Sequence, residues 1–391
     1  MKYLTALLIS IILCMQPSYA QEQDKEITKE EADGADVSAP SALLMEKTTG
    51  QIIFEKDGDT QRPPASVTKI MTLLLIFDAL KEGEISLADE VVTSEYAASM
   101  GGSQVYLEPG ETQTVDTMIK CIAVASANDA CVAMAEYICG SEEAFVDEMN
   151  KRANELEMKN TNFKNCNGLD TEGHLTTARD IAIMSRELIV NYPEIRDYCM
   201  IWQEPITHKT QNGTEEFGLT NTNKLVRHYE YATGLKTGST SQAKFCISAT
   251  AEKEGFELIA VIMAAEDSKS RNADAVKLFG YGFSKIRKYE DEVKYIEPVK
   301  LDRGEKEHIK VMQEKKFDYV DISGADLTKI ERKIKFNKNI KAPVKKGEQV
   351  GSVEYYISGK KVGDIPILAT ESVKEISYNS VMKKIMKDVL L

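Results

Sequence analysis

The chain has 391 residues, so two domains are the default expectation. Its composition, 42% hydrophobic and 28% charged, is that of an ordinary globular protein. The formal net charge of −13 argues against nucleic acid as a partner, because a phosphate-binding surface normally carries a basic excess. The chain has only 4 histidines, so a zinc site or a histidine-based catalytic triad would have to be built from very few residues.

The first 20 residues predict a secretory signal peptide. Lys2 supplies the positive charge, and residues 4–15 are an apolar stretch too short to span a membrane as a helix. Residues 18–20 place small side chains where a signal peptidase cleaves, so we expect cleavage after them. Cys14 leaves a lipoprotein signal as the alternative, which the bulky Leu13 before it disfavours.

Residues 21–40 are acidic, contain no aromatic residue and have few apolar side chains, a composition that predicts a disordered spacer. Order is expected to begin at Ser41. Residues 41–47 and 51–56 are rich in apolar side chains on either side of a Thr-Thr-Gly turn, which predicts a β-hairpin. The two prolines at 63–64 then interrupt regular structure.

A catalytic domain is predicted over residues 41–290. Its predicted helices cover residues 66–80, which are apolar nearly all round, 116–137, 177–190 behind a threonine cap, and 274–286. Its predicted strands after the hairpin cover residues 234–238, 244–251 and 256–265. The first and last strands are far apart in the chain, so we expect an α/β (α+β) fold in which helices flank an antiparallel sheet.

Residues 294–370 predict a small all-β domain, because short alternating segments are separated by glycine and charged turns. Residues 371–391 predict a C-terminal amphipathic helix with lysines off its apolar face. That face is formed by Val381, Met382, Ile385, Met386, Val389 and Leu390. A basic amphipathic helix can lie in a membrane surface, which is the interpretation we favour. The alternative is a helix that docks on the β domain.

Six cysteines follow the predicted signal peptide: Cys121, Cys131, Cys139, Cys166, Cys199 and Cys246. An even number of cysteines in an exported protein is compatible with disulfides. Several of these, however, lie in apolar helical stretches or in a strand, and they show neither a dense framework nor the paired spacing of a zinc site. We therefore expect mostly free, buried thiols.

Ser66 and Lys69 are three residues apart at the start of the first predicted helix, so their side chains share one face. A serine hydroxyl needs an adjacent base to become a nucleophile. Lysine can be that base only when it is neutral, and burial or a second nearby cation lowers its pKa. A serine cap followed by a surface lysine is the common alternative, but here Lys69 would be a charge inside an apolar helix.

Ser126 and Asn128 lie in a Ser-Ala-Asn turn between two apolar helical segments. Such a turn can place two short polar side chains in a cleft. The hydroxyl of Ser126 can relay a proton between lysine, nucleophile and leaving amine, and the amide of Asn128 can donate to and accept from a peptide bond. A polar turn between helices is the alternative.

Lys236, Thr237 and Gly238 end a predicted strand. Lys236 can steady the hydroxyl of Ser126 and attract a substrate carboxylate, which Thr237 can also hydrogen-bond. Gly238 lets a substrate backbone lie against the strand edge, because no side chain blocks it. The backbone amides of Ser66 and Ser239 can form an oxyanion hole. An ordinary strand end is the alternative.

These three strings resemble the motif set of the penicillin-recognising serine enzymes, and most closely that of the low-molecular-weight penicillin-binding proteins, the serine-type D-alanyl-D-alanine carboxypeptidases. The resemblance covers residues 41 to about 286, and the β domain and tail match the layout of that family. Further strings that carry it lie at residues 62–72, 167–170, 173–180 and 233–239.

The resemblance implies a penicillin-binding/β-lactamase-like catalytic domain that needs no metal or cofactor. It implies that Ser66 is the acyl-enzyme nucleophile, Lys69 the proton acceptor, Ser126 the proton shuttle and Lys236 the anchor for the substrate carboxylate. The implied substrate is a peptidoglycan stem pentapeptide ending in D-Ala-D-Ala, with β-lactams as covalent inhibitors. The expected location is outside the cytoplasm, peripheral on the outer face of the cytoplasmic membrane.

Three departures bear on the alternatives. Class A β-lactamases typically carry Ser-Asp-Asn in the second string and a glutamate that positions water, whereas this chain has Ala127 and only Glu172, outside that pattern. Ser239 stands where several family members have histidine. A β-lactamase, a D,D-endopeptidase or transpeptidase, and a catalytically silent wall-binding protein stay as alternatives to a D,D-carboxypeptidase.

Overall fold

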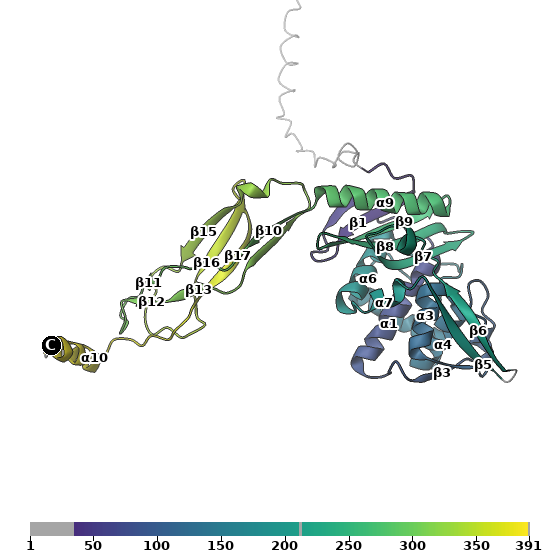
Figure 1. Ribbon diagram of the computed structural model, residues 1–391, viewed down its shortest axis with the longest axis horizontal. Coiled ribbons are helices and arrows are strands. Elements are labelled where there is room, and N and C mark those ends of the chain that lie inside the picture. Colours follow the sequence, from purple (N-terminus) through teal and green to yellow (C-terminus); the bar gives the residue numbers. More distant parts are fainter. Residues whose placement is uncertain (1–34, 211–212, 390–391) are drawn as a thin grey trace, which may run out of the picture.

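The computed structural model describes residues 35–210 and 213–389. The predicted signal peptide and residues 21–34 of the predicted spacer lie outside these ranges. Two units follow each other along the chain, a mixed unit of helices and strands and an all-β unit, with a helix at the far end of the second (Figure 1).

A five-stranded antiparallel sheet forms the centre of the first unit, in the order β2-β1-β9-β8-β7. Its strands are β1 (Ser41–Glu46), β2 (Ile52–Lys56), β7 (Ala232–Thr240), β8 (Lys244–Lys253) and β9 (Phe256–Ala265). The predicted hairpin and the three predicted strands are confirmed. Leu43 of β1 pairs with Val261 of β9, so the two ends of the domain close the sheet against each other.

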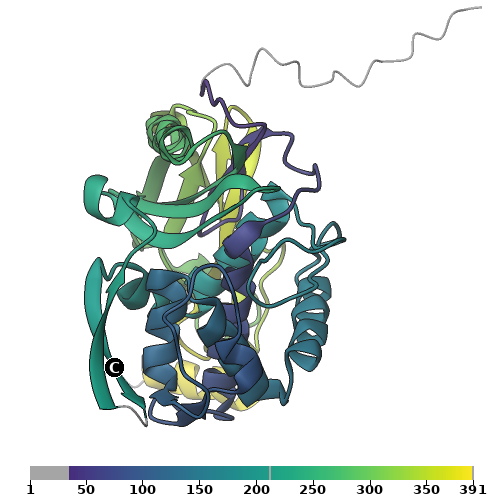
Figure 2. The ribbon, with the colours of Figure 1, turned by 90° about the vertical axis from the view of Figure 1, so that its right-hand side faces the viewer.

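Helices cover both faces of this sheet (Figures 1 and 2). On one face α9 (Ser268–Lys285) buries Leu278 and Phe279 against the strands. On the other face lie α1 (Lys69–Glu82) and α6 (Ala178–Asn191). The Thr177 hydroxyl accepts a bond from the amide of Asp180, which confirms the predicted threonine cap. α9 begins before the predicted start, because Asp267 and Ser270 form a capping box.

The predicted helical region 116–137 is broken where the sequence places its Ser-Ala-Asn turn. It consists of α3 (Val115–Lys120), a π-helical segment (Cys121–Ala125) and α4 (Asn128–Cys139). Ser126 between them has a φ of +63°, in the left-handed region. The remaining helices of this unit, which the periodicity did not predict, are α2 (Glu95–Ala98), α5 (Glu142–Glu155), α7 (Ile195–Cys199) and α8 (Leu225–His228).

A long hairpin of β5 (Gln203–Thr210) and β6 (Gly213–Thr220) runs alongside the helical layer (Figure 2). The sequence did not predict it, because most of its side chains are polar and exposed. Among the described residues of the two strands, only Ile206, His208 and Leu219 are buried. A short ladder of β3 (Glu90–Val92) and β4 (Thr112–Thr114) completes this unit.

Residues 35–40 correct the predicted extent of the disordered spacer. Ala35, Val37 and Ala39 are buried against the cluster that α9 forms with the sheet. The Ser38 hydroxyl and the Ala39 amide both donate to a carboxylate oxygen of Asp274, at 2.9 Å and 2.8 Å. Alternating small apolar side chains and one buried carboxylate therefore order this segment, although the predicted spacer 21–40 as a whole is acidic.

The all-β unit has a four-stranded sheet in the order β13-β17-β16-β15 and two ladders, β10 with β14 and β11 with β12. Tyr355 and Phe317 stack in its core with ring centroids 3.7 Å apart. The predicted all-β fold of this unit is confirmed, but the unit begins before the predicted start at residue 294, because Arg287–Asp291 pairs with β14. Its strands are β10 (Arg287–Asp291), β11 (Val299–Lys300), β12 (His308–Ile309), β13 (Val311–Gln313), β14 (Phe317–Asp321), β15 (Glu331–Phe336), β16 (Gln349–Ile357) and β17 (Lys360–Ala369).

The chain ends in α10 (Tyr378–Val389), at the end of the β domain away from the catalytic domain (Figure 1). Val381, Met382 and Met386 of the predicted apolar face are exposed, so these three side chains do not dock on the β domain. None of the described helices is long and apolar enough to cross a membrane. The six cysteines are free, and all but Cys139 are buried, as predicted.

Candidate active site

The candidate nucleophile Ser66 lies in a single 3-10 turn (Ala65–Thr68) that leads directly into α1. Sequence reasoning placed it in the first turn of an α-helix, so the turn is tighter than predicted. Ala65, immediately before the serine, has a φ of +50°, a conformation that persists only where surrounding structure holds it. Lys69 Nζ is 3.0 Å from Ser66 Oγ, which confirms that the two side chains share one face.

Lys69 is fully buried, and its amine has three oxygen neighbours. Besides Ser66 Oγ these are Asn128 Oδ1 and the backbone oxygen of Asn167, both at 2.6 Å. A neutral amine has two N–H donors and one lone pair. The two carbonyl oxygens accept its two N–H groups, so the lone pair is left for the hydroxyl proton of Ser66.

Burial lowers the pKa of Lys69, and nearby Cys131, Cys166 and Asp129 oppose that shift only in part. No carboxylate among the described residues lies within ion-pair distance of the amine. An ammonium buried without a counter-charge is unfavourable, so the protein favours the neutral form. The arrangement suits a general base.

The second motif contributes two side chains with different surroundings. Ser126 Oγ is buried and has no hydrogen-bond partner among the described residues. Asn128 is already engaged, since its Oδ1 contacts Lys69 and its Nδ2 donates to the Gly101 oxygen at 2.7 Å. The sequence predicted that the Asn128 amide would hydrogen-bond a substrate peptide bond. In the structure, this amide contacts Lys69 and orients it.

Lys236 is the second buried amine of the site, and only 1% of its surface is exposed. Its Nζ donates to the backbone oxygen of Thr237 at 3.0 Å. Burial, followed by the charge of Lys69, lowers the pKa of Lys236 to about 7. Thr237 Oγ1 donates to Thr222 Oγ1 at 2.8 Å. The attraction between a protonated Lys236 and an incoming carboxylate is strong, because water is excluded from the surroundings of the amine.

Gly238 has a structural role that was not predicted. A Cβ at this position would lie 2.6 Å from the amide nitrogen of Ser66 and 2.8 Å from that of Val67. The missing side chain therefore lets β7 lie directly against the 3-10 turn. This contact also brings the strand that continues into Ser239 next to the backbone of Ser66.

Sequence reasoning missed the loop that supports the other side of the nucleophile turn. A Cβ on Gly168, whose φ is +88°, would lie 2.0 Å from the backbone oxygen of Ala65. The neighbouring Asn167 supplies the backbone oxygen that contacts Lys69. The string at residues 167–170 was one sign of the family resemblance, but nothing in it indicates a backbone contact.

His174 in the same loop also holds the nucleophile turn. The amide of Lys164 donates to His174 Nδ1 at 2.9 Å, so the ring proton is on Nε2, 2.8 Å from Thr68 Oγ1. The Thr68 hydroxyl in turn donates to the Ala65 oxygen at 2.8 Å. Burial lowers the pKa of His174 to about 4, so the ring is neutral and this chain of bonds is fixed.

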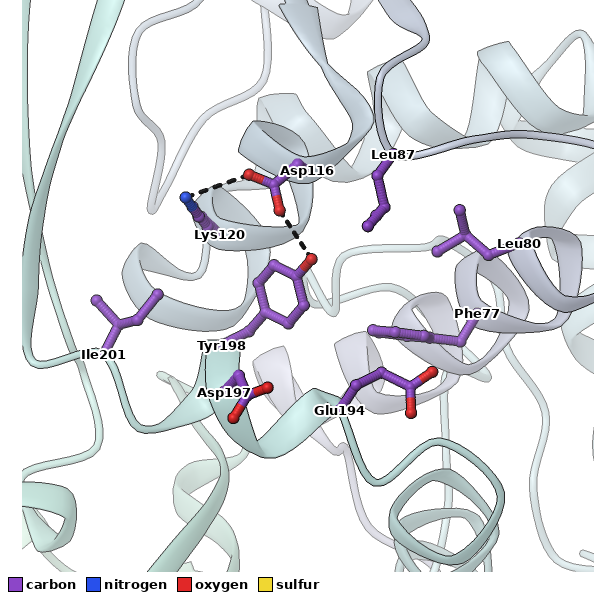
Figure 3. A pocket seen from close by; sticks show the side chains of 9 residues that line it. All are labelled: Phe77, Leu80, Leu87, Asp116, Lys120, Glu194, Asp197, Tyr198 and Ile201. Carbon is purple, nitrogen blue, oxygen red and sulfur yellow. Dashed lines mark hydrogen bonds and ion pairs between the residues drawn. The ribbon is translucent and has the colours of Figure 1, made fainter.

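A separate hollow of about 510 Å³ lies between the far end of α1, α3 and α7, and contains none of the predicted site residues (Figure 3). Tyr198 donates to Asp116 at 2.8 Å, and Lys120 pairs with the same carboxylate at 3.2 Å. These three polar groups thus satisfy one another, and because the hollow contains none of the predicted site residues, we assign it no part in the chemistry. In the described ranges, no cluster of three or more histidine, cysteine, aspartate or glutamate side chains is placed to hold a metal ion.

Two buried lysines without carboxylate partners among the described residues, one of them 3.0 Å from a serine hydroxyl, are an arrangement suited to serine acyl transfer. Comparison with known proteins agrees with this class. A family model described as D-alanyl-D-alanine carboxypeptidase matches residues 26–267, and one described as the C-terminal domain of penicillin-binding protein 5 matches residues 283–375.

Relatives extend the match to nearly the whole chain. D-alanyl-D-alanine carboxypeptidase DacF of Bacillus subtilis is 40% identical over 99% of this chain and 98% of its own length. DacD of Escherichia coli is 33% identical over 88% of this chain and 89% of its own length. The chain belongs to the D-alanyl-D-alanine carboxypeptidase family, the low-molecular-weight penicillin-binding proteins, as the sequence predicted.

Solved structures agree. Penicillin-binding protein 5 from Haemophilus influenzae has a TM-score of 0.70 at 28% identity, covering 87% of this chain and 98% of its own. Penicillin-binding protein 6B from Escherichia coli has a TM-score of 0.68 at 30% identity, covering 85% and 95%. Both the catalytic fold and the β domain are therefore shared with that family.

Proposed function

We propose that this chain is an exported serine D,D-carboxypeptidase that removes the terminal D-alanine from peptidoglycan stem pentapeptides. The observation that carries the proposal is the position of Lys69 Nζ, between Ser66 Oγ and two carbonyl oxygens that occupy its N–H groups. This geometry leaves the amine one role towards the serine, which is to accept its proton.

Acylation follows from these positions. As Ser66 Oγ attacks the carbonyl between the two D-alanines, its proton passes to Lys69, and the amides of Ser66 and Ser239 stabilise the oxyanion. When the peptide bond breaks, the leaving amine takes a proton by way of the Ser126 hydroxyl. D-alanine departs and leaves an ester on Ser66. Lys69 then accepts a proton from the water that attacks the ester, and a proton returns from Lys69 to Ser66 Oγ as the ester bond breaks.

Lys236 and Thr237 give the site its preference for a free C-terminus. Both side chains are buried, and neither has a carboxylate partner among the described residues. A substrate carboxylate supplies the counter-charge, and the carboxylate of a penicillin does the same. A β-lactam therefore acylates Ser66, and the ester stays bound to it as a covalent inhibitor.

Two measurements test the proposal on the protein without its signal peptide. The enzyme should release D-alanine from a stem pentapeptide and should be labelled by a fluorescent penicillin, and Ser66→Ala should abolish both. Ser284→Ala is the matched control, since Ser284 is an exposed serine on α9. Labelling that persists in Ser66→Ala contradicts the proposal.

The same assays separate the alternatives. Fast nitrocefin turnover would indicate a β-lactamase. Loss of cross-linked products from intact sacculi, without D-alanine release from free pentapeptide, would indicate an endopeptidase. A wild-type protein that penicillin does not label would be a catalytically silent wall-binding protein.

The proposal includes a location on the outer face of the cytoplasmic membrane. The exposed side chains of Val381, Met382 and Met386 on α10 support it, because water-exposed apolar side chains on one helix favour an interface. Flotation with vesicles, with and without residues 370–391, tests this part of the proposal. Equal flotation of both proteins contradicts it.

A further inference from the structure

Four lysines without ion-pair partners lie together in the connection between β15 and β16. Eight of the 17 lysines at residues 287–376 are paired with carboxylates: Lys288, Lys294, Lys306, Lys316, Lys329, Lys333, Lys335 and Lys361. In contrast, the segment 338–346 contains no acidic residue, and its four lysines have no ion-pair partner among the described residues. These are Lys338, Lys341, Lys345 and Lys346, and all four are exposed.

The backbone around these lysines is held in place. Ala342 and Val344 are buried in the core of the β domain, while the residues between and beside them are exposed. Val344 exchanges two backbone hydrogen bonds with Val373, of 3.0 Å and 2.9 Å. The alternation of buried and exposed positions directs Lys341 and Lys345 outward from a fixed edge, so the positive charge is concentrated in one place.

The same bonds put the lysines beside the terminal helix. The amide of Lys346 donates to Ser372 Oγ at 2.9 Å, and Val373 pairs with Val344, only a few residues before α10 begins at Tyr378. The Ala342 amide donates to the Asp302 oxygen, next to β11, which lies at the end of the domain that carries α10 (Figure 1). The cationic segment and the apolar helix therefore belong to one end of the molecule.

We propose that residues 338–346 form a second membrane-contact surface, which binds anionic phospholipid headgroups beside the apolar side chains of α10. The inference rests on the proposed membrane location and not on the catalytic proposal. A single amphipathic element gives weak, reversible binding, and stable attachment needs a second signal such as a basic patch. Each lysine at an anionic bilayer surface strengthens binding by about fivefold, an attraction that salt weakens.

A lipid surface fits these observations better than an anionic wall polymer does. A polyanion satisfies the lysines but leaves Val381, Met382 and Met386 in water. A bilayer with anionic lipids meets both sets of side chains at once, because its headgroups are charged and the region beneath them is apolar.

The test measures how the full mature chain partitions onto vesicles of phosphatidylcholine, with or without about one third phosphatidylglycerol. The variant replaces Lys338, Lys341, Lys345 and Lys346 with glutamine. On the anionic vesicles we expect it to partition at least about tenfold more weakly than the wild type at low salt, a gap that closes as salt is added. On vesicles of phosphatidylcholine alone the two proteins should bind equally.

The matched control replaces four paired lysines with glutamine and so changes the net charge by the same amount. These lysines are Lys288, Lys316, Lys329 and Lys361. An equal loss of binding in the control would mean that total charge is responsible and would overturn the proposal. Unchanged binding in the test variant would do the same. Binding to soluble polyphosphate that depends on the four lysines, with vesicle binding unaffected, would assign the surface to a wall polymer instead.

Catalysis is measured in parallel. D-alanine release from a soluble pentapeptide should be the same in the wild type, the test variant and the control, because the substituted lysines are in the β domain. Failure of the catalytic proposal would appear as absent release in all three proteins, whereas failure of the membrane proposal leaves release intact.

Discussion

The catalytic domain and the β domain each bury ionisable side chains, but only those of the β domain are paired with groups of opposite charge. In the β domain, Asp291 is surrounded by matching partners, since Tyr355 donates to it at 2.8 Å and Arg332 and Lys294 pair with it at 3.3 Å and 2.5 Å. In the catalytic domain, Lys69 and Lys236 are buried more completely, without any carboxylate partner among the described residues.

The difference separates a structural cluster from a reactive one. A buried charge with partners on every side keeps its protonation state and stabilises one arrangement. A buried amine without a counter-charge has a lowered pKa, so it can serve as a base near neutral pH, and an incoming anion stabilises its charged form. Four experiments test this difference between paired and unpaired buried charges. The first has the largest expected effect on acylation by penicillin.

Replacing Lys69 with methionine should have the largest effect. The substitution removes the proton acceptor but keeps the length of the side chain, so the acylation rate should fall by about 10²–10⁴-fold. The melting temperature should change little, because the loss of the buried amine is offset by the loss of its bonds to Asn128 Oδ1 and the Asn167 oxygen. Lys294→Met in the β domain is the control and should leave acylation unchanged. Acylation within tenfold of the wild type would exclude Lys69 as the base.

Gly168→Ala should have the next largest effect. Its Cβ would lie 2.0 Å from the Ala65 oxygen, so the turn that carries Ser66 must shift. A displacement of about 1 Å at a reacting group can cost about 10²-fold in rate. Gly324→Ala is the matched control, since Gly324 has a φ of +78° but no atom within 4 Å of its Cβ position. The control should lose stability without losing acylation. Equal rates in the two variants would contradict the predicted displacement.

The pH dependence of the acylation rate should report the protonation of both Lys69 and Lys236. As pH falls, Lys69 becomes protonated and can no longer accept the proton of Ser66, so the rate declines on the acid side. As pH rises through about 7, the lowered pKa of Lys236, that amine loses its charge and its attraction for the penicillin carboxylate. A bell-shaped profile is expected, and the two limbs belong to a coupled pair. Lys236→Arg should remove the alkaline limb, because arginine keeps its charge. An alkaline limb that survives this substitution belongs to another group.

Tyr355→Phe should have the smallest effect on acylation and a clear effect on stability. It leaves Asp291 without one of its hydrogen bonds in the core of the β domain. Unfolding of that domain should become easier by about 1–3 kcal/mol, as measured by thermal or denaturant unfolding. The acylation rate should match that of the wild type. A reduced rate would show that the two domains are energetically coupled.

The parts of the site that sequence could predict are those that depend on local geometry. Ser66 and Lys69 are one helical turn apart, so their contact follows from spacing alone. The strands around Lys236 follow from apolar runs bounded by glycine and charged turns. The same applies to the Thr177 cap and to most of the β domain.

The parts that it could not predict depend on contacts between distant segments. The amide of Asn128 was expected to face substrate, but it orients Lys69, 59 residues away. The bond between Thr68 and His174 spans 106 residues, and nothing in either local pattern indicates it. The close contact of Gly238 with the turn that carries Ser66, far away in the chain, was not predicted either. The polar β5–β6 hairpin lacks the apolar alternation that marks a strand.

The buried hydroxyl of Ser126 has a consequence for the free enzyme. A buried polar group without a partner destabilises a protein by about 1–3 kcal/mol, and Ser126 Oγ has no partner among the described residues. A bound peptide or a β-lactam adduct that reaches this hydroxyl removes the deficit, so the acylated enzyme should resist heat better than the free enzyme. The Ser126→Ala variant should have a higher melting temperature and a lower turnover rate than the wild type. The Ser126 hydroxyl oxygen would then lower stability while supporting activity.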